Sequence, residues 1–154
     1  MSVHERFWAK VDKSAPDGCW VWTSAVAGDR DSGRCYGTIT IDYRNVYAHR
    51  LSYEWSHGHI PDGMMVDHKC HNNLCVNPDH LRLASPAQNQ RNLSGARRDS
   101  STGLRNIKRL GSRWRVRVTR QGKVHERAFM ELEDAKAWAK EKRVELFGEF
   151  AGFG

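Results

Sequence analysis

Residues 66–92 read VDHKCHNNLCVNPDHLRLASPAQNQRN and hold two of the four cysteines and three of the eight histidines of the chain. Cys70 and Cys75 are separated by four residues, and His80 follows after four more. Thiolate and imidazole groups are the ligands that zinc prefers, and a structural zinc site is tetrahedral. The stretch therefore predicts a structural zinc site with three ligands on one short loop.

The same stretch carries side chains suited to a second site. Asp67 and His68 precede the cysteines, and Asn89 follows His68 by 21 residues. Imidazole accepts a proton near neutral pH, whereas carboxylate and amide oxygens suit a hard cation such as Mg²⁺. One segment thus combines the residues for a structural metal with those for a catalytic metal.

These residues resemble the HNH nucleases of the His-Me finger superfamily, in particular the zinc-bearing branch that includes intron-encoded homing endonucleases. The match rests on the Asp-His pair at 67–68, on the run CHNNLCVNPDHL from residue 70 to 81, and on Asn89. The resemblance implies a β-hairpin that carries the histidine as general base. It also implies a following helix that returns the asparagine to a divalent cation. The aspartate before the histidine would either bind that cation or support the hairpin.

A tetrahedral site needs a fourth ligand, and two further cysteines are available, Cys19 and Cys35. The zinc-bearing nucleases draw one cysteine from an early strand, ahead of a Tyr-Gly strand similar to residues 36–39, so the resemblance favours Cys19. Cys35 is the alternative, although a buried thiol also packs well as a small apolar side chain. Since the N-terminus has no signal-peptide core, zinc explains the cysteines better than disulfides do.

Local patterning predicts an α+β fold. A mixed polar and apolar segment that ends at a glycine predicts a helix over 48–57. Strands are expected at 64–68 and 81–83, and serine followed by proline at 85–86 predicts the start of the next helix. This order is the strand, strand, helix arrangement of a ββα-metal module.

Charge divides the chain into two unequal parts. Residues 1–92 hold ten Lys/Arg and ten Asp/Glu, whereas residues 93–154 hold fifteen and eight. Residues 93–102, LSGARRDSST, have the small and polar composition of a linker. We therefore expect a nuclease domain at 1–92, a linker at 93–102 and a second domain at 103–154. A basic second part joined to a neutral catalytic part indicates that the second part binds a polyanion.

The second part begins with a strictly alternating segment, in which a strand would place Arg113, Arg115 and Arg117 on one face. A turn is expected at 121–123. The remaining expected elements are strands at 104–110 and 124–130 and a helix at 133–147. Together they predict a small three-stranded antiparallel sheet covered by one helix.

This arrangement resembles the AP2 DNA-binding domain over residues 101–151. The resemblance rests on the run SRWRVRV, a downstream Ala-Phe pair, an alanine-bearing helix and the closing FGEFA. It implies that the sheet enters the major groove of DNA. The side chains expected to contact DNA are Arg91, Arg105, Arg113, Arg115, Arg117 and Arg127.

The sequence thus predicts a metal-dependent HNH endonuclease of homing type that hydrolyses double-stranded DNA, with structural Zn²⁺ and catalytic Mg²⁺ or another divalent cation. The alternative is a non-catalytic, zinc-stabilised DNA-binding regulator. No apolar run approaches the roughly 18 residues of a membrane span, so no membrane partner is expected. We expect a soluble protein that is located inside a bacterial or phage-infected cell, in the cytoplasm or nucleoid. The sequence leaves open whether the protein forms a homodimer.

Overall fold

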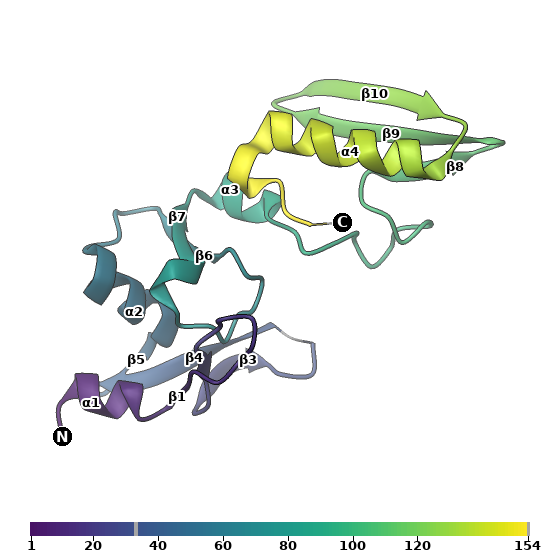
Figure 1. The fold of residues 1–154 in the computed structure, drawn as a ribbon. Coiled ribbons are helices and arrows are strands. Elements are labelled where there is room, and N and C mark those ends of the chain that lie inside the picture. Colours follow the sequence, from purple (N-terminus) through teal and green to yellow (C-terminus); the bar gives the residue numbers. More distant parts are fainter. Residues whose placement is uncertain (33, 154) are drawn as a thin grey trace. The chain divides into compact units, whose positions relative to one another are not determined.

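A computed structural model describes residues 1–32 and 34–153. The chain forms two compact units, one from Met1 to Pro86 and one from Ala87 onward. The division falls at the start of helix α3 (Pro86–Arg91), ahead of the segment 93–102. Figure 1 shows the elements of each unit, which are described separately below.

The first unit contains an antiparallel sheet with the order β3-β4-β5, made of β3 (Val26–Asp29), β4 (Arg34–Ile41) and β5 (Arg44–Tyr47). Strands β4 and β5 are joined by Asp42 and Tyr43, both with positive φ, which is the conformation of a two-residue hairpin turn. Ile39 of β4 belongs to a buried core cluster with Phe7, Trp22, Ala48 and Val76.

Short elements complete the core of the first unit. Helix α1 (Val3–Trp8) begins with a capping box between Ser2 and Glu5. Strands β1 (Val11–Asp12) and β2 (Val21–Trp22) pair antiparallel. Helix α2 (Ala48–His57) ends at Gly58, with φ of 90°, as its sequence predicts.

The predicted hairpin is confirmed as β6 (Met65–His68) and β7 (Leu81–Ala84), which pair antiparallel with His68 opposite Leu81. The connection between them contains the 3₁₀ helix η1 (Pro78–His80). Helix α3 follows β7 in the chain, and the order strand, strand, helix is that of an HNH ββα module.

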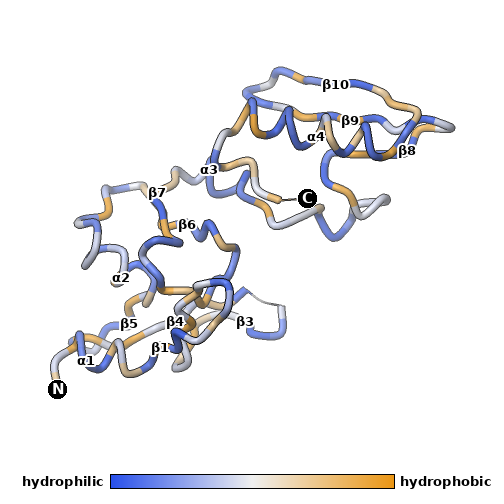
Figure 2. Tube along the Cα trace, viewed as in Figure 1, coloured by the Kyte–Doolittle hydropathy of each residue, from blue (hydrophilic) through white to orange (hydrophobic). Residues whose placement is uncertain are grey.

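The second unit is a three-stranded antiparallel sheet with one helix, as predicted. The strand order is β10-β9-β8, from β8 (Ile107–Leu110), β9 (Arg113–Arg120) and β10 (Lys123–Phe129). Helix α4 (Leu132–Phe147) lies along one face of this sheet, and η2 (Gly148–Phe150) follows it (Figure 1). In Figure 2, apolar and polar segments alternate along α4, as expected for a helix with one packed side.

Two local features set the strand lengths of this sheet. Gln121 and Gly122 have φ of 49° and 79°, so they form a two-residue turn that pairs Lys123 with Arg120. Strand β8 is shorter than the expected 104–110, because Asn106 takes a left-handed φ of 66°. The chain therefore leaves the edge of the sheet beside Arg117, whose N–H donates to the Asn106 carbonyl.

The segment 93–102 forms no helix or strand, but it is hydrogen-bonded within the second unit. The Thr102 hydroxyl donates to the Ile107 carbonyl at 2.7 Å, and the Phe153 N–H donates to the Leu93 carbonyl at 2.8 Å. The segment with linker composition is thus part of a folded unit. Within residues 1–32 and 34–153, none of the helices has the length and apolar composition needed to cross a bilayer.

Candidate metal centre and catalytic hairpin

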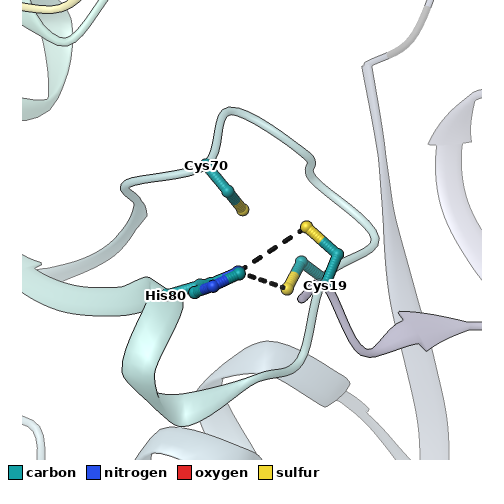
Figure 3. Close-up of side chains that lie close together, drawn as sticks. Cys19, Cys70 and His80 are labelled. Atoms are coloured by element: carbon teal, nitrogen blue, oxygen red, sulfur yellow. Dashed lines mark hydrogen bonds between the residues drawn. The ribbon is translucent and has the colours of Figure 1, made fainter. Parts of the chain in front are cut away.

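Three cysteines and a histidine converge in the first unit. Cys19 lies just before β2, Cys70 and Cys75 lie between β6 and β7, and His80 ends η1. One ligand atom from each residue lies within 4.8 Å of all the others. Figure 3 shows the Cys19 and Cys70 side chains directed toward the His80 ring. The structure therefore places Cys19 in this cluster, whereas Cys35 lies buried on β4 outside it.

The distances in this cluster fit a tetrahedral zinc ion. His80 Nδ1 lies 3.6 Å from the Sγ atoms of Cys19 and Cys75. With Zn–S and Zn–N bonds of about 2.3 and 2.05 Å, tetrahedral geometry separates sulfur and nitrogen ligands by about 3.6 Å. The donor set of three sulfurs and one imidazole nitrogen is also one that zinc prefers. The residues present can hold Zn²⁺.

Backbone pairing holds the two sides of the cluster together. Val21 bridges to Cys75, the Trp22 N–H donates to the Leu74 carbonyl, and the Val76 N–H donates to the Trp20 carbonyl. These bonds fix the segment that contains Cys19 against the loop between β6 and β7. The metal ligands are thus presented on paired backbone.

Asn77 braces the cluster through its side chain. Its Nδ2 donates to the Gly18 carbonyl at 2.8 Å, and its Oδ1 accepts the Asp79 N–H at 3.0 Å. Its own N–H donates to the Cys75 sulfur at 3.4 Å. Asn77 therefore connects the chain before Cys19 to the turn that carries His80.

The electrostatics of the thiols favour a cation among them. Burial raises the pKa of the Cys19 thiol to about 11. A hydrogen bond with Cys75, together with burial, raises the pKa of Cys70, and the same hydrogen bond lowers the pKa of Cys75. Three thiolates this close repel one another, and a coordinating dication removes that repulsion and stabilises the deprotonated form.

His68 lies at the end of β6 and is only 5% exposed. Its Nε2 lies 3.1 Å from the Cys75 carbonyl oxygen. A carbonyl can only accept, so this nitrogen carries the proton in the neutral ring and the lone pair is on Nδ1. Burial lowers the pKa of His68 to about 4, an effect that the Cys75 carbonyl and Asp67 partly oppose. The ring is therefore neutral near pH 7.

Asp67 is also buried, and it faces Arg82 across the hairpin. The Arg82 Nε donates to Asp67 Oδ2 at 2.9 Å, and the two residues are direct partners in the β6–β7 register. Both side chains are largely shielded from solvent. This ion pair fixes the orientation of the carboxylate beside His68.

His49 is a residue of this region that the sequence did not reveal. It lies in the first turn of α2, is 7% exposed, and its ring centroid lies 4.9 Å from that of His68. Burial, together with the nearby His68 and Arg50, lowers the pKa of His49 to about 3. Tyr36 and Tyr47 lie against the same ring, with centroids 5.3 and 5.8 Å away. Only tertiary structure brings these residues to the hairpin, so no local motif indicates them.

Asn89 and Arg91 belong to helix α3. Asn89 is its fourth residue and is half-buried. The Arg91 guanidinium lies over the Phe147 ring at 5.3 Å, within the second unit.

The strand register shows on which face of the β10-β9-β8 sheet each of the arginines expected to contact DNA lies. Arg113, Arg115 and Arg117 alternate with Trp114, Val116 and Val118, and the latter face α4, as predicted. Directly paired residues share a face, so Lys108 of β8, opposite Arg115, joins the arginine face. Arg127 is opposite Val116, so it lies on the other face of the sheet from these arginines, where its side chain is exposed.

Arg105, which is also among the arginines expected to contact DNA, is buried. Nη1 donates to the Ala151 carbonyl at 2.6 Å and Nη2 to the Arg91 carbonyl at 2.7 Å. Two longer bonds reach the carbonyls of Leu93 and Phe153. Burial, with a contribution from Arg143, lowers the pKa of Arg105 to about 10. Arg105 is therefore a structural residue that joins three segments of the second unit.

Comparison with known proteins identifies the hairpin region. Residues 46–91 match the family model described as HNH endonuclease. Protein 3.8 of Escherichia phage T7 is 35% identical over 113 residues, which cover 72% of this chain and 93% of that protein. Protein 2.8 of the same phage is 31% identical over 91 residues, 58% of each chain.

A further relative is L560 of Acanthamoeba polyphaga mimivirus, whose name describes it as an uncharacterized HNH endonuclease. It is 33% identical over 115 residues, which cover 73% of this chain and 59% of that protein. No solved structure was found to match the chain. Because the family model covers the hairpin and the cysteine loop, and Protein 3.8 matches over nearly its whole length, the chain belongs to the HNH endonuclease family.

Proposed function

We propose that the protein is a metal-dependent endonuclease of homing type that hydrolyses phosphodiester bonds in double-stranded DNA. The observation that carries this proposal is the hydrogen bond between His68 Nε2 and the Cys75 carbonyl. This bond fixes the ring orientation and leaves the lone pair on Nδ1, where a general base needs it. Family membership and the basic second unit support the choice of DNA as substrate.

His68 is the proposed general base. Its Nδ1 takes a proton from the water that attacks the phosphorus atom, and the imidazolium is stabilised by Asp67 next to it in the chain. The Asp67–Arg82 ion pair keeps the carboxylate in one orientation. Burial keeps His68 neutral at physiological pH, so the base form is the populated one.

A divalent cation, Mg²⁺ or another, completes the proposed catalytic site. The amide oxygen of Asn89 is the proposed ligand, and Asp67 either adds a carboxylate oxygen or supports the hairpin through Arg82. Both oxygen types suit a hard cation. When bound, the cation supplies positive charge that stabilises the pentacovalent phosphate and the leaving 3′ oxygen. Zinc at Cys19, Cys70, Cys75 and His80 has a structural role in this proposal.

The second unit is the proposed DNA-binding part, similar to an AP2 domain in its sheet and single helix. Arg113, Arg115 and Arg117 share an exposed face of the sheet, and α4 covers the other face. Guanidinium groups on a strand suit both phosphate contacts and guanine edges. Arg105 and Arg127 are left out of this surface for the reasons given above. The relatives encoded by phage and virus genomes support action on DNA inside an infected cell.

The test is incubation of the purified protein with supercoiled plasmid, with and without added Mg²⁺. Conversion to nicked or linear DNA only with the cation is expected. Binding to duplex DNA without cleavage under any divalent cation would instead support the regulator, in which the hairpin is only a zinc-stabilised fold.

A further inference from the structure

A cavity of about 550 Å³ lies within the second unit, at the point where the chain leaves the edge of the sheet. Its lining combines the segment after α3 with the arginine face, and it includes Arg97 from the former and Lys108, Arg115 and Arg117 from the latter. We propose that this cavity is a binding site for the sugar-phosphate backbone of one DNA strand. The proposal rests on the proposed function, since it assigns part of the DNA surface.

Charge is the first argument. The cavity is lined by six Lys/Arg residues and by only one acidic residue, Asp99. Of the six, Arg105 is committed to backbone carbonyls and Arg91 lies over Phe147. The other four bring positive charges together, and like charges at this density repel unless an anion lies among them.

The state of these four side chains is the second argument. Arg117 has an acidic partner, Glu126 at 3.8 Å, with both side chains well exposed. Among the described residues, the side chains of Arg97, Lys108 and Arg115 make no ion pair or hydrogen bond. Their donors are therefore available to phosphate oxygens.

The construction of the cavity is the third argument. Asn106 donates from Nδ2 to the Arg117 carbonyl at 3.0 Å and accepts the Arg117 N–H at its own carbonyl. Arg105 fixes Arg91 and Leu93 on the other side. The walls are thus joined by hydrogen bonds, and the volume lies in the range of pockets that bind small ligands. A site of this size holds a short stretch of backbone.

This placement changes the expected DNA surface. An AP2-like surface uses the sheet alone, whereas this cavity adds Arg97 from the segment whose composition is that of a linker. That segment would then contribute to affinity.

The test compares two double variants that each remove two positive charges. Arg97→Ala with Lys108→Ala removes cavity residues, and Arg120→Ala with Lys123→Ala removes exposed residues outside the cavity. Duplex DNA affinity is measured across a salt series without added divalent cation. Circular dichroism confirms that both variants fold.

The cavity variant should bind at least tenfold more weakly near physiological salt, and its slope of log K against log salt should fall by about 1.8, or 0.9 per phosphate contact. The matched variant should change by less than twofold. Equal losses in the two variants would overturn the assignment of the cavity while leaving the nuclease proposal intact. A parent protein that does not bind duplex DNA would overturn both.

A second arm measures binding of a free deoxynucleoside triphosphate. A cavity variant that loses this ligand but keeps parental affinity for duplex DNA would show that the site takes a mononucleotide, and the backbone assignment would be rejected.

Discussion

Replacement of Arg105 tests whether this arginine holds the fold or contacts DNA. Its two short hydrogen bonds, 2.6 Å to Ala151 and 2.7 Å to Arg91, come from a charged donor. Hydrogen bonds to charged groups contribute about 1.5–3 kcal/mol each, so Arg105→Met should remove about 3–6 kcal/mol. Relief of the desolvation and of the repulsion from Arg143 offsets part of this, so a loss near the lower end of the range, about 3 kcal/mol, is expected. The acceptor carbonyls would also be left buried and unsatisfied.

A loss of this size is large for a unit of this length. In domains of 60–100 residues, 1 kcal/mol lowers Tm by about 4–8 °C, so the second unit should unfold at least about 12 °C earlier. Thermal unfolding measures this, and hydrogen exchange should locate the opening in β9 and α4. Arg113→Met is the matched control, because Arg113 is exposed and has no such bonds. A variant of Arg105 with unchanged Tm and a salt slope lower by about 0.9 would refute the reasoning and return Arg105 to the DNA surface.

Three further predictions address the metals and the DNA surface. The purified protein should contain about one zinc ion per chain. Strong chelators or Cys70→Ser should unfold the first unit, because zinc binding contributes about 10–16 kcal/mol to the stability of such sites. Elemental analysis that finds no zinc would contradict this prediction. Asn89→Ala should lose cleavage activity, and a higher Mg²⁺ concentration should restore part of it, which kinetics across a Mg²⁺ series will measure. Rescue by imidazole instead would contradict a role of Asn89 in cation binding. Joint replacement of Arg113, Arg115 and Arg117 by alanine should weaken duplex binding and flatten its salt dependence, and an unchanged slope would remove the sheet from the DNA surface.

The sequence predicts most of what is local in this protein. The cysteine loop, the hairpin around Asp67 and His68, and the turns at glycines all depend on residues close in the chain. The position of Arg127 was also predictable in principle. A two-residue turn at 121–122 pairs residue 120 with residue 123, and continuing this antiparallel register away from the turn places Arg127 opposite Val116.

Residues fixed by tertiary structure could not be found in this way. Arg105 reads as one more arginine of a basic stretch, and only the return of the chain at Ala151 shows that its guanidinium is buried. His49 has no spaced partner in the sequence, yet α2 places it against His68. The segment 93–102 has linker composition, but hydrogen bonds to residues on both sides of it join it to the second unit.

The cleavage rate of the His68→Ala variant tests the central claim most directly. Supercoiled plasmid and Mg²⁺ are used for the parent, for His68→Ala and for His59→Ala, since His59 is an exposed histidine outside the hairpin. General base catalysis contributes about 10²–10⁴-fold, so His68→Ala should cleave at least a hundredfold more slowly while binding duplex DNA as the parent does. His59→Ala should cleave at the parental rate. Cleavage by His68→Ala within about tenfold of the parent, a difference of roughly 1.4 kcal/mol, would show that His68 is not the base.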